Sequence, residues 1–429
     1  MGTEEVRMTV EQRDYTAHAK LSPSSASGWM QCAAYPDVNA QYLNEDNEAA
    51  AEGTAAHAIS DFCLTHGFDA YDMIGTVTNI TGKRRKSVKD SSGRWIKTDE
   101  VETVNWSFTW TEDDADALQP GIDWIREQEG TFYGEARVDL SDWLGENQFG
   151  TMDRVILSDS GILVSDLKWG RGIAVQAVGN KQLRLYALGA WKKYASHITD
   201  PAFPVTIHID QPRNAAGGGF WTVTLGELLE FGEEARAAAE ATRQPEPPRN
   251  PSVDACLWCA GKDDCDAYHK FNLSFLGLDD FSDLDDLEDL ALPDPQGFTP
   301  ARRRVIMEHA PLIKKWLESV HASLFQAAMN GDDTAGLKLV EGRKNPDKWK
   351  DPKAAEKALT ARLAEKSFTK KLITPTQAGK AISPEDWKPI FEEHVIVGAR
   401  KPTLVDEADD RPALESFTDA GDFDDLDDD

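Results

Sequence analysis

The sequence predicts an α/β fold in which helices cover a mixed central sheet, followed by a small helix-rich C-terminal domain. Three observations support this prediction. Helical and strand-like patterns alternate along the first part of the chain, which is typical of a sheet layered with helices. A strand–turn–strand pattern lies at the centre of this order. The length of 429 residues is sufficient for two or three domains with a sizeable core.

Residues 1–17 are polar and are expected to form a flexible N-terminus. From Ser22 to about Gly67 the pattern is helical. The run Ser22-Pro-Ser-Ser offers capping residues, and the stretch from Glu48 to Leu64 is rich in alanine with few helix breakers. We therefore expect helices in this region, with the alanine-rich stretch as the main one.

The next segments alternate between strands and a helix. Strands are expected at Thr103 to Thr111 and at Tyr133 to Leu140, both entering the central sheet, and a helix from about Val175 to Tyr194. A further strand pair, Val205 to Asp210 and Phe220 to Leu225, is expected to flank a glycine-rich turn.

A β-hairpin is the most informative of these elements. Thr151 to Leu157 and Ile162 to Lys168 are rich in apolar and β-branched residues and flank the turn cluster Ser158-Asp-Ser-Gly161. Asp166 and Lys168 then lie on one face of a strand, and Asp153 lies on its partner. Two carboxylates beside a lysine suit Mg²⁺ or Mn²⁺. A surface hairpin with an ordinary Asp–Lys salt pair is the alternative.

Three further residues are candidates for the same site. His57 lies in the alanine-rich helix, where a neutral imidazole is a suitable ligand for Mn²⁺ or Mg²⁺, although a partly buried core histidine is the alternative. Glu52 lies slightly more than one helical turn away, and Glu135 lies in the predicted strand from Tyr133 to Leu140. We treat both glutamates as accessory candidates.

Four motifs resemble the RecB-type branch of the PD-(D/E)XK nuclease superfamily. They are Gly53-Thr-Ala-Ala-His57, Gly150-Thr-Met-Asp153, Asp166-Leu-Lys168 and Gln182-Leu-Arg-Leu-Tyr186. A phage-associated group within that branch is similar also in Trp29-Met-Gln-Cys32, Ala51-Glu-Gly-Thr-Ala-Ala-His57 and Asp166-Leu-Lys-Trp-Gly170. The resemblance covers about the first 270 residues and implies a restriction-endonuclease-like core.

The resemblance also implies a role for each matching residue. It implies that metal is bound by His57, Asp153, Asp166 and the backbone carbonyl of Leu167. It implies that Lys168 assists the attacking water, and that Gln182 and Tyr186 support the site and the scissile phosphate.

The cysteines suggest a second metal centre. The spacing Cys256-x2-Cys259-x5-Cys265 is tight enough for ligands of one centre. The layout resembles iron–sulfur members of the same branch, which implies Cys32 as the fourth ligand of a [4Fe-4S] cluster. A structural Zn²⁺ site with the same ligands is the alternative. Cys63 is expected to be a core thiol.

The formal net charge of −29 at first opposes DNA binding, because phosphate contacts need Lys and Arg. However, the acid is concentrated in the strips from Leu276 to Asp294 and from Leu404 to Asp429, which carry about 19 of the 29 excess charges. The candidate DNA-binding patch is basic and surrounds a turn. It comprises Lys83, Arg84, Arg85 and Lys86, with Lys89, Arg94 and Lys97 nearby. A solvated loop is the alternative.

These patterns divide the chain into five expected parts. They are a flexible N-terminus (1–17), a RecB-like nuclease domain with the cysteine cluster (18–272), an acidic linker (273–298), a small α+β C-terminal domain (299–403) and a disordered acidic tail (404–429). A strong helix is expected from Thr299 to Asn330. No signal peptide or membrane-length apolar run is present, so we expect a cytoplasmic protein without a membrane partner, in the bacterial host cytoplasm if phage-encoded.

Two functional hypotheses follow. The first is a Mg²⁺- or Mn²⁺-dependent DNA exonuclease that hydrolyses phosphodiester bonds in phage DNA recombination or processing. DNA is its expected partner, with a single-strand annealing or other recombination protein as a second. The alternative is a catalytically silent nuclease-fold scaffold that binds DNA or a recombination partner.

Overall fold

The computed structural model describes residues 19–89, 95–275, 297–330 and 332–334, together with the single positions 383, 385 and 388. The chain divides into two compact units, Met1–Leu339 and Val340–Asp429. Every helix and strand described below lies in the first unit. The predicted N-terminus, nearly all of the acidic linker, most of the C-terminal domain beyond its first helix, and the acidic tail lie outside the described residues.

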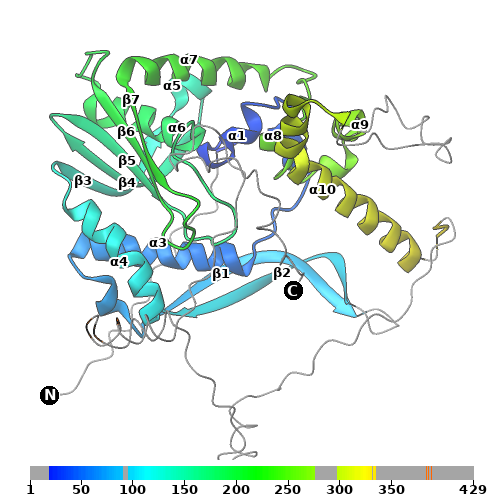
Figure 1. Ribbon diagram of the computed structural model, residues 1–429, viewed down its shortest axis with the longest axis horizontal. Coiled ribbons are helices and arrows are strands. Elements are labelled where there is room, and N and C mark those ends of the chain that lie inside the picture. Colours follow the sequence, from blue (N-terminus) through cyan, green and yellow to red (C-terminus); the bar gives the residue numbers. More distant parts are fainter. Residues whose placement is uncertain are drawn as a thin grey trace, which may run out of the picture. The chain divides into compact units, whose positions relative to one another are not determined.

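Helices and strands alternate along the first unit (Figure 1). In chain order they are η1 (Pro23–Ser25), α1 (Ala26–Trp29), α2 (Tyr35–Asn39), α3 (Glu48–His66), η2 (Ala70–Met73), β1 (Val77–Lys89), β2 (Trp95–Thr109), α4 (Glu112–Arg126), β3 (Thr131–Asp139), α5 (Ser141–Leu144), β4 (Phe149–Ser158), β5 (Gly161–Leu167), α6 (Lys181–Ala190), η3 (Trp191–Ala195), β6 (Pro204–Asp210), β7 (Gly219–Thr224), α7 (Leu225–Ala241), α8 (Val253–Cys256), η4 (Lys262–Asp264), α9 (Asp266–Phe275) and α10 (Pro300–Asn330).

A five-stranded mixed sheet forms the centre of the unit, with strand order β3-β4-β5-β6-β7. Only β5 and β6 are parallel, and the other neighbours are antiparallel. Two parallel neighbours need a crossover connection, and α6 lies in that connection. The prediction of an α/β fold with a mixed central sheet is therefore confirmed.

Helices cover both faces of this sheet (Figure 1). On one face, α6 and α7 bury side chains such as Leu183 and Phe231 against Val164 and Ile207 of the central strands. On the other face, α3 and α4 pack against Leu167 at the end of β5. The end of β5 therefore lies between two packed layers, which fixes the position of the residues that flank Leu167.

The alanine-rich helix is confirmed as α3. The Asn47 side chain accepts a hydrogen bond from the Ala50 amide at its N-terminus, and Gly67 ends it with a left-handed φ of 76°. The region before it, from Ser22, forms only the short helices η1, α1 and α2. α3 alone therefore supplies the long helical face of this region.

Two of the predicted elements need correction. The strand predicted at Thr103 to Thr111 belongs to β2, which pairs with β1 in a separate two-stranded ribbon instead of entering the central sheet. The physical reason is that β1 and β2 follow one another in the chain and pair with each other as antiparallel neighbours, with Val77 opposite Thr109. The helix predicted from Val175 begins only at Lys181, because Asn180 caps it by accepting a hydrogen bond from the Leu183 amide.

α10 packs against the cysteine-bearing segment. It carries Leu312 and Trp316, both buried with Tyr268 of α9. The Tyr268 hydroxyl donates to the Leu312 carbonyl at 3.3 Å, and Trp316 Nε1 donates to His269 Nδ1 at 3.1 Å. The predicted helix from Thr299 to Asn330 is thus present. Among the described residues, no helix is both long and apolar enough to cross a membrane.

His208 gives the sheet a pH dependence that can be measured. Burial lowers the pKa of His208 to about 4, while the Ser165 hydroxyl lies 2.9 Å from its Nδ1. Because the unfolded chain binds this proton more tightly, stability is lost as pH falls from about 6.5 to about 4, by about 3 kcal/mol in total. We expect the free energy of unfolding of His208→Gln, measured with urea at several pH values, to vary less across this window than that of the wild type.

The matched control is His321→Gln, which removes an exposed imidazole from α10. It should leave the wild-type pH profile unchanged. A profile for His208→Gln as steep as that of the wild type would show that acid acts through other groups.

Candidate functional site

Carboxylates lie side by side where β3, β4 and β5 meet. Gly134 pairs with Arg154, and Ala136 with Met152, so Glu135 on β3 lies opposite Asp153 on β4. Arg154 and Ser165 form the last pair between β4 and β5 at this end. Asp153 and Asp166 therefore follow at the point where these two strands separate. Glu135, Asp153 and Asp166 lie close together because they occupy equivalent positions along three neighbouring strands.

Glu135 has an unusual backbone. Its φ is 44°, in the left-handed region that non-glycine residues rarely adopt. Such a conformation costs on the order of 1 kcal/mol or more and is enriched at functional sites. The backbone conformation of Glu135 therefore distinguishes it from an ordinary strand residue and favours a role as a ligand.

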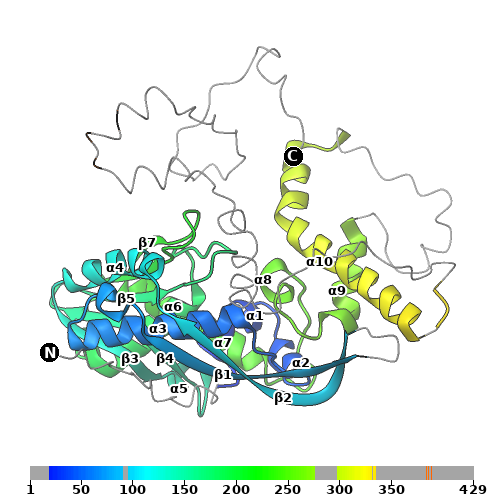
Figure 2. The same ribbon diagram turned by 90° about the horizontal axis from the view of Figure 1, so that it is seen from below.

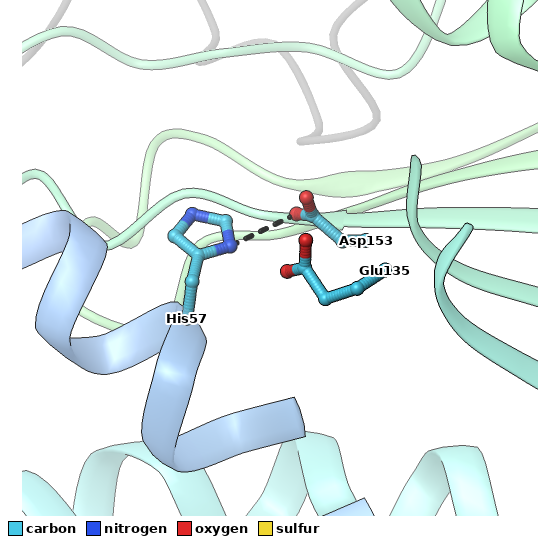
Figure 3. Close-up of side chains that lie close together, drawn as sticks. All are labelled: His57, Glu135 and Asp153. Atoms are coloured by element: carbon cyan, nitrogen blue, oxygen red, sulfur yellow. Dashed lines mark ion pairs between the residues drawn. The ribbon is translucent and has the colours of Figure 1, made fainter. Parts of the chain in front are cut away.

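His57 of α3 completes a cluster with two of these carboxylates. Its Nδ1 lies 3.2 Å from Asp153 Oδ2. One ligand atom from each of His57, Glu135 and Asp153 lies within 4.8 Å of the others. Figure 3 shows the imidazole turned toward Asp153, with the Glu135 carboxylate beside it. Helix α3 and strands β3 and β4 together form this three-residue cluster.

A second set of contacts joins the cluster to α6. The Leu167 amide donates to Asp153 Oδ2 at 3.0 Å. Asp166 Oδ2 lies 2.8 Å from Lys168 Nζ, and Gln182 Nε2 donates to Asp166 Oδ1 at 3.2 Å.

Lys168 Nζ donates to Gln182 Oε1 at 3.3 Å, and Gln182 Nε2 also lies 3.3 Å from the Tyr186 hydroxyl. The amide of Gln182 thus holds the positions of Asp166, Lys168 and Tyr186 relative to one another.

Neighbouring charges and burial together shift the pKa values of the acidic and basic groups in the site. Burial lowers the pKa of His57, but Asp153 and Asp166 outweigh it and leave that pKa raised. Burial raises the pKa of Asp153, but His57, Lys168 and the Leu167 amide hold it at about 2. Burial is also the main cause of the raised pKa of Asp166. For Lys168, burial lowers the pKa, but Asp166 and Asp153 leave it raised.

This donor set fits a divalent cation. Carboxylate oxygens with one imidazole nitrogen are ligands that Mg²⁺ and especially Mn²⁺ accept. Asp166 Oδ2 is buried and has no hydrogen bond of good geometry to any described group, despite its short distance to Lys168. A buried carboxylate oxygen in that state is available to a cation. The structure therefore contains a possible metal site centred on His57, Glu135 and Asp153.

The two accessory glutamates have different surroundings. Glu135 lies in the cluster, whereas Glu52 pairs with Arg213 Nη1 at 2.7 Å. The sequence offered both glutamates as accessory candidates, Glu52 from its spacing to His57 and Glu135 from its place in a predicted strand. The strand register places only Glu135 opposite Asp153, and that register is not visible in the sequence.

Gly150 is a supporting residue to which the sequence motif assigned no role. A Cβ atom at this position would lie 2.7 Å from Tyr186 Cε1 and 2.8 Å from Pro23 Cγ. The absence of a side chain lets β4 approach the Tyr186 ring closely.

Gly150→Ala is expected to lower the free energy of unfolding by about 1–3 kcal/mol, because the added methyl group overpacks this contact. Thermal or urea unfolding measures the loss. Gly170→Ala is the matched control, since its Cβ would meet no atom within 4 Å. Equal unfolding midpoints for the two variants would contradict the proposed contact.

Four cysteines line one small pocket. Cys32 follows α1, Cys256 ends α8, and Cys259 and Cys265 lie between α8 and α9. Burial raises the pKa of the Cys256 thiol to about 11, and the other three cysteines add to the rise. Tyr268 also lines the pocket, whereas Trp258 is 66% exposed and is not among the lining residues. Cys63 is buried on α3 in a different cluster, as expected of a core thiol.

The predicted basic patch lies on the β1–β2 ribbon, which runs beside α3 in Figure 2. Arg94 and the side chains of Lys89 and Lys97 lie outside the part of the chain that the structure describes. Three of the four central cations form ion pairs. Arg84 pairs with Glu102, Arg85 with Glu45, and Lys86 with Glu100. The Lys83 backbone amide donates to Asp46, which leaves the charge of the Lys83 side chain unchanged. The three ion pairs reduce the charge that the patch can offer to a phosphate.

A mixed sheet between helical layers, with a half-buried cluster of His57, Glu135 and Asp153 on α3, β3 and β4, defines an α/β protein with a candidate divalent-metal site. Residues 18–412 match a family described as "Protein of unknown function (DUF2800)". The match spans most of the chain, so the chain belongs to this family.

Proposed function

We propose that this protein is a Mg²⁺- or Mn²⁺-dependent deoxyribonuclease of PD-(D/E)XK type, acting as an exonuclease in DNA recombination or processing. The observation that carries the proposal is the junction of the His57, Glu135 and Asp153 cluster with Asp166 and Lys168. Carboxylates that can share a cation, next to an anchored ammonium group, are the groups that phosphodiester hydrolysis requires.

Each residue has a defined task in this proposal. His57, Asp153 and Asp166 supply ligand atoms together with the Leu167 carbonyl, and Glu135 joins them. A bound divalent cation supplies Lewis acidity toward a phosphate oxygen.

Lys168 carries three N–H donors. One of them is donated to Gln182, and Nζ lies 2.8 Å from Asp166 Oδ2, so a further donor can orient the attacking water or a phosphate oxygen. Gln182 and Tyr186 hold this arrangement in place.

A comparison of the two accessory glutamates tests the proposal. The wild type should degrade linear DNA when Mn²⁺ is present. Glu135→Gln should weaken Mn²⁺ binding by about 10- to 100-fold and slow cleavage, because it removes a charged oxygen from the cluster. Glu52→Gln, whose parent side chain pairs with Arg213, should change neither. Calorimetric Mn²⁺ titration and DNA degradation measure the two effects.

If the wild type cleaves no linear DNA with either cation, the enzyme proposal fails and the scaffold alternative takes its place. If both glutamine variants behave alike, Glu135 is not a ligand.

For the cysteines we propose a [4Fe-4S] cluster held by Cys32, Cys256, Cys259 and Cys265. The support is that four thiols from two distant segments line one pocket. Such a cluster would join the start of the domain to its end and add to its folding free energy. Structural Zn²⁺ on the same four ligands is the alternative, and metal analysis distinguishes them.

A further inference from the structure

A second basic feature lies outside the candidate metal site. A cavity of about 580 Å³ lies between the end of β3, the start of β4 and η3, at the side of the sheet where β3 is the outermost described strand. Arg137, Lys192 and Lys193 line it, together with Asp139 and Phe149. None of these residues has a role in the proposed metal chemistry.

Arg137 is held in a fixed orientation. Its guanidinium carbon lies 3.6 Å from the centroid of the Phe149 ring. Lys193 Nζ donates to the Arg137 carbonyl at 2.8 Å, which leaves two of its three donors available. Among the described residues, neither cation forms an ion pair with a carboxylate. A planar guanidinium and an ammonium group that line one cavity suit a phosphate.

Lys192, in the same cavity, has a different environment. Its Nζ lies 2.8 Å from Asp139 Oδ2 and 2.8 Å from Asp142 Oδ2. The hydrogen bond from Lys192 is the main cause that lowers the pKa of Asp139 to about 2, and Ser141 adds to it. The charge of Lys192 is therefore already balanced by carboxylates of the protein. Lys192 provides an internal comparison for Arg137 and Lys193.

The cavity adjoins the candidate metal site along the same strands. Arg137 pairs with Thr151 across β3 and β4, and each of them is two residues from Glu135 or Asp153. Two residues along a strand span roughly 7 Å. That distance is about two nucleotide rises along one DNA strand.

We propose that this cavity binds a backbone phosphate of the DNA strand that flanks the scissile bond, through Arg137 and Lys193. The inference rests on the proposed nuclease function, because it assumes DNA at the neighbouring cluster. It also resolves the difficulty raised by the net charge of −29, since local cations that carry no carboxylate partner must hold the polyanion.

The salt dependence of DNA binding tests this subsite. A short fluorescein-labelled single strand is titrated with the full chain at several salt concentrations, and anisotropy gives the binding constant. The plot of log K against log salt has a negative slope, and each lost phosphate contact should reduce the magnitude of that slope by about 0.7. Arg137→Gln and Lys193→Gln should each show this reduction. Lys192→Gln, with the same loss of charge, should keep the wild-type slope.

Thermal unfolding of each variant confirms that it is folded, and the double variant Arg137→Gln/Lys193→Gln should show both reductions. Wild-type slopes in all variants, or no DNA binding by the wild type, would overturn the subsite. The proposed nuclease function is judged separately by Mn²⁺-dependent cleavage. Cleavage with unchanged slopes overturns only the subsite, and changed slopes without cleavage support the subsite but overturn the nuclease.

Discussion

Asp166→Asn is expected to reduce Mn²⁺-dependent DNA cleavage on the order of a thousandfold. Asparagine has the same shape as aspartate, but its side chain is a neutral amide. The substitution removes the charge from a buried oxygen that has no hydrogen-bond partner among the described residues. The variant loses a ligand for the cation, and Lys168 loses its closest anion. Initial rates of degradation of linear DNA, measured over a range of Mn²⁺ concentrations, give the size of the effect.

The matched control is Asp159→Asn in the exposed turn of the same hairpin, which removes an equal charge from the surface. It should cleave like the wild type. Circular dichroism should show both variants folded. If Asp166→Asn retains cleavage within a few-fold of the wild type, the catalytic centre must lie elsewhere in the chain.

Cys256→Ala is expected to remove the proposed metal centre and to destabilise the first unit by an amount on the order of several kcal/mol. Cys256 is 7% exposed and lies in one cluster with Tyr268 and Leu312, so the loss of the metal would loosen α8, α9 and α10 together. Protein purified without oxygen should be brown, with a broad absorbance shoulder in the blue, and the variant should be colourless. Iron, sulfide and zinc analysis and thermal unfolding complete the measurement.

Cys63→Ala removes a fully buried thiol from α3 and should keep the colour and the metal content. Colourless wild-type protein with stoichiometric zinc would replace the iron–sulfur assignment with zinc. Wild-type stability in Cys256→Ala would instead show that these cysteines hold no structural metal.

Local patterns predicted the hairpin and α3 well, because each is determined by neighbouring residues. The alternation from Thr151 to Lys168 and the alanines before Gly67 are sufficient to identify them. The start of α6 was wrong by several residues, because capping by Asn180 decides it and the apolar pattern does not.

Long-range pairing could not be predicted in the same way. The sequence did not show that β2 would pair only with β1, nor that Glu135 would lie opposite Asp153. Both depend on strand register over distances that no local pattern records. The same limit explains why Glu52 and Glu135 were equal candidates, and why the pairing of the ribbon cations with Glu45, Glu100 and Glu102 was not expected.

The contact of α10 with α9 has a practical consequence for dividing the chain. A fragment that ends at α9 would leave Tyr268 without the Leu312 carbonyl and His269 without the Trp316 indole. It would also expose apolar surface next to Cys256 and Cys265. Any shortened version intended to preserve the cysteine pocket must therefore extend beyond Trp316, and proteolytic cleavage within α10 should disturb the cysteine pocket before it disturbs the sheet.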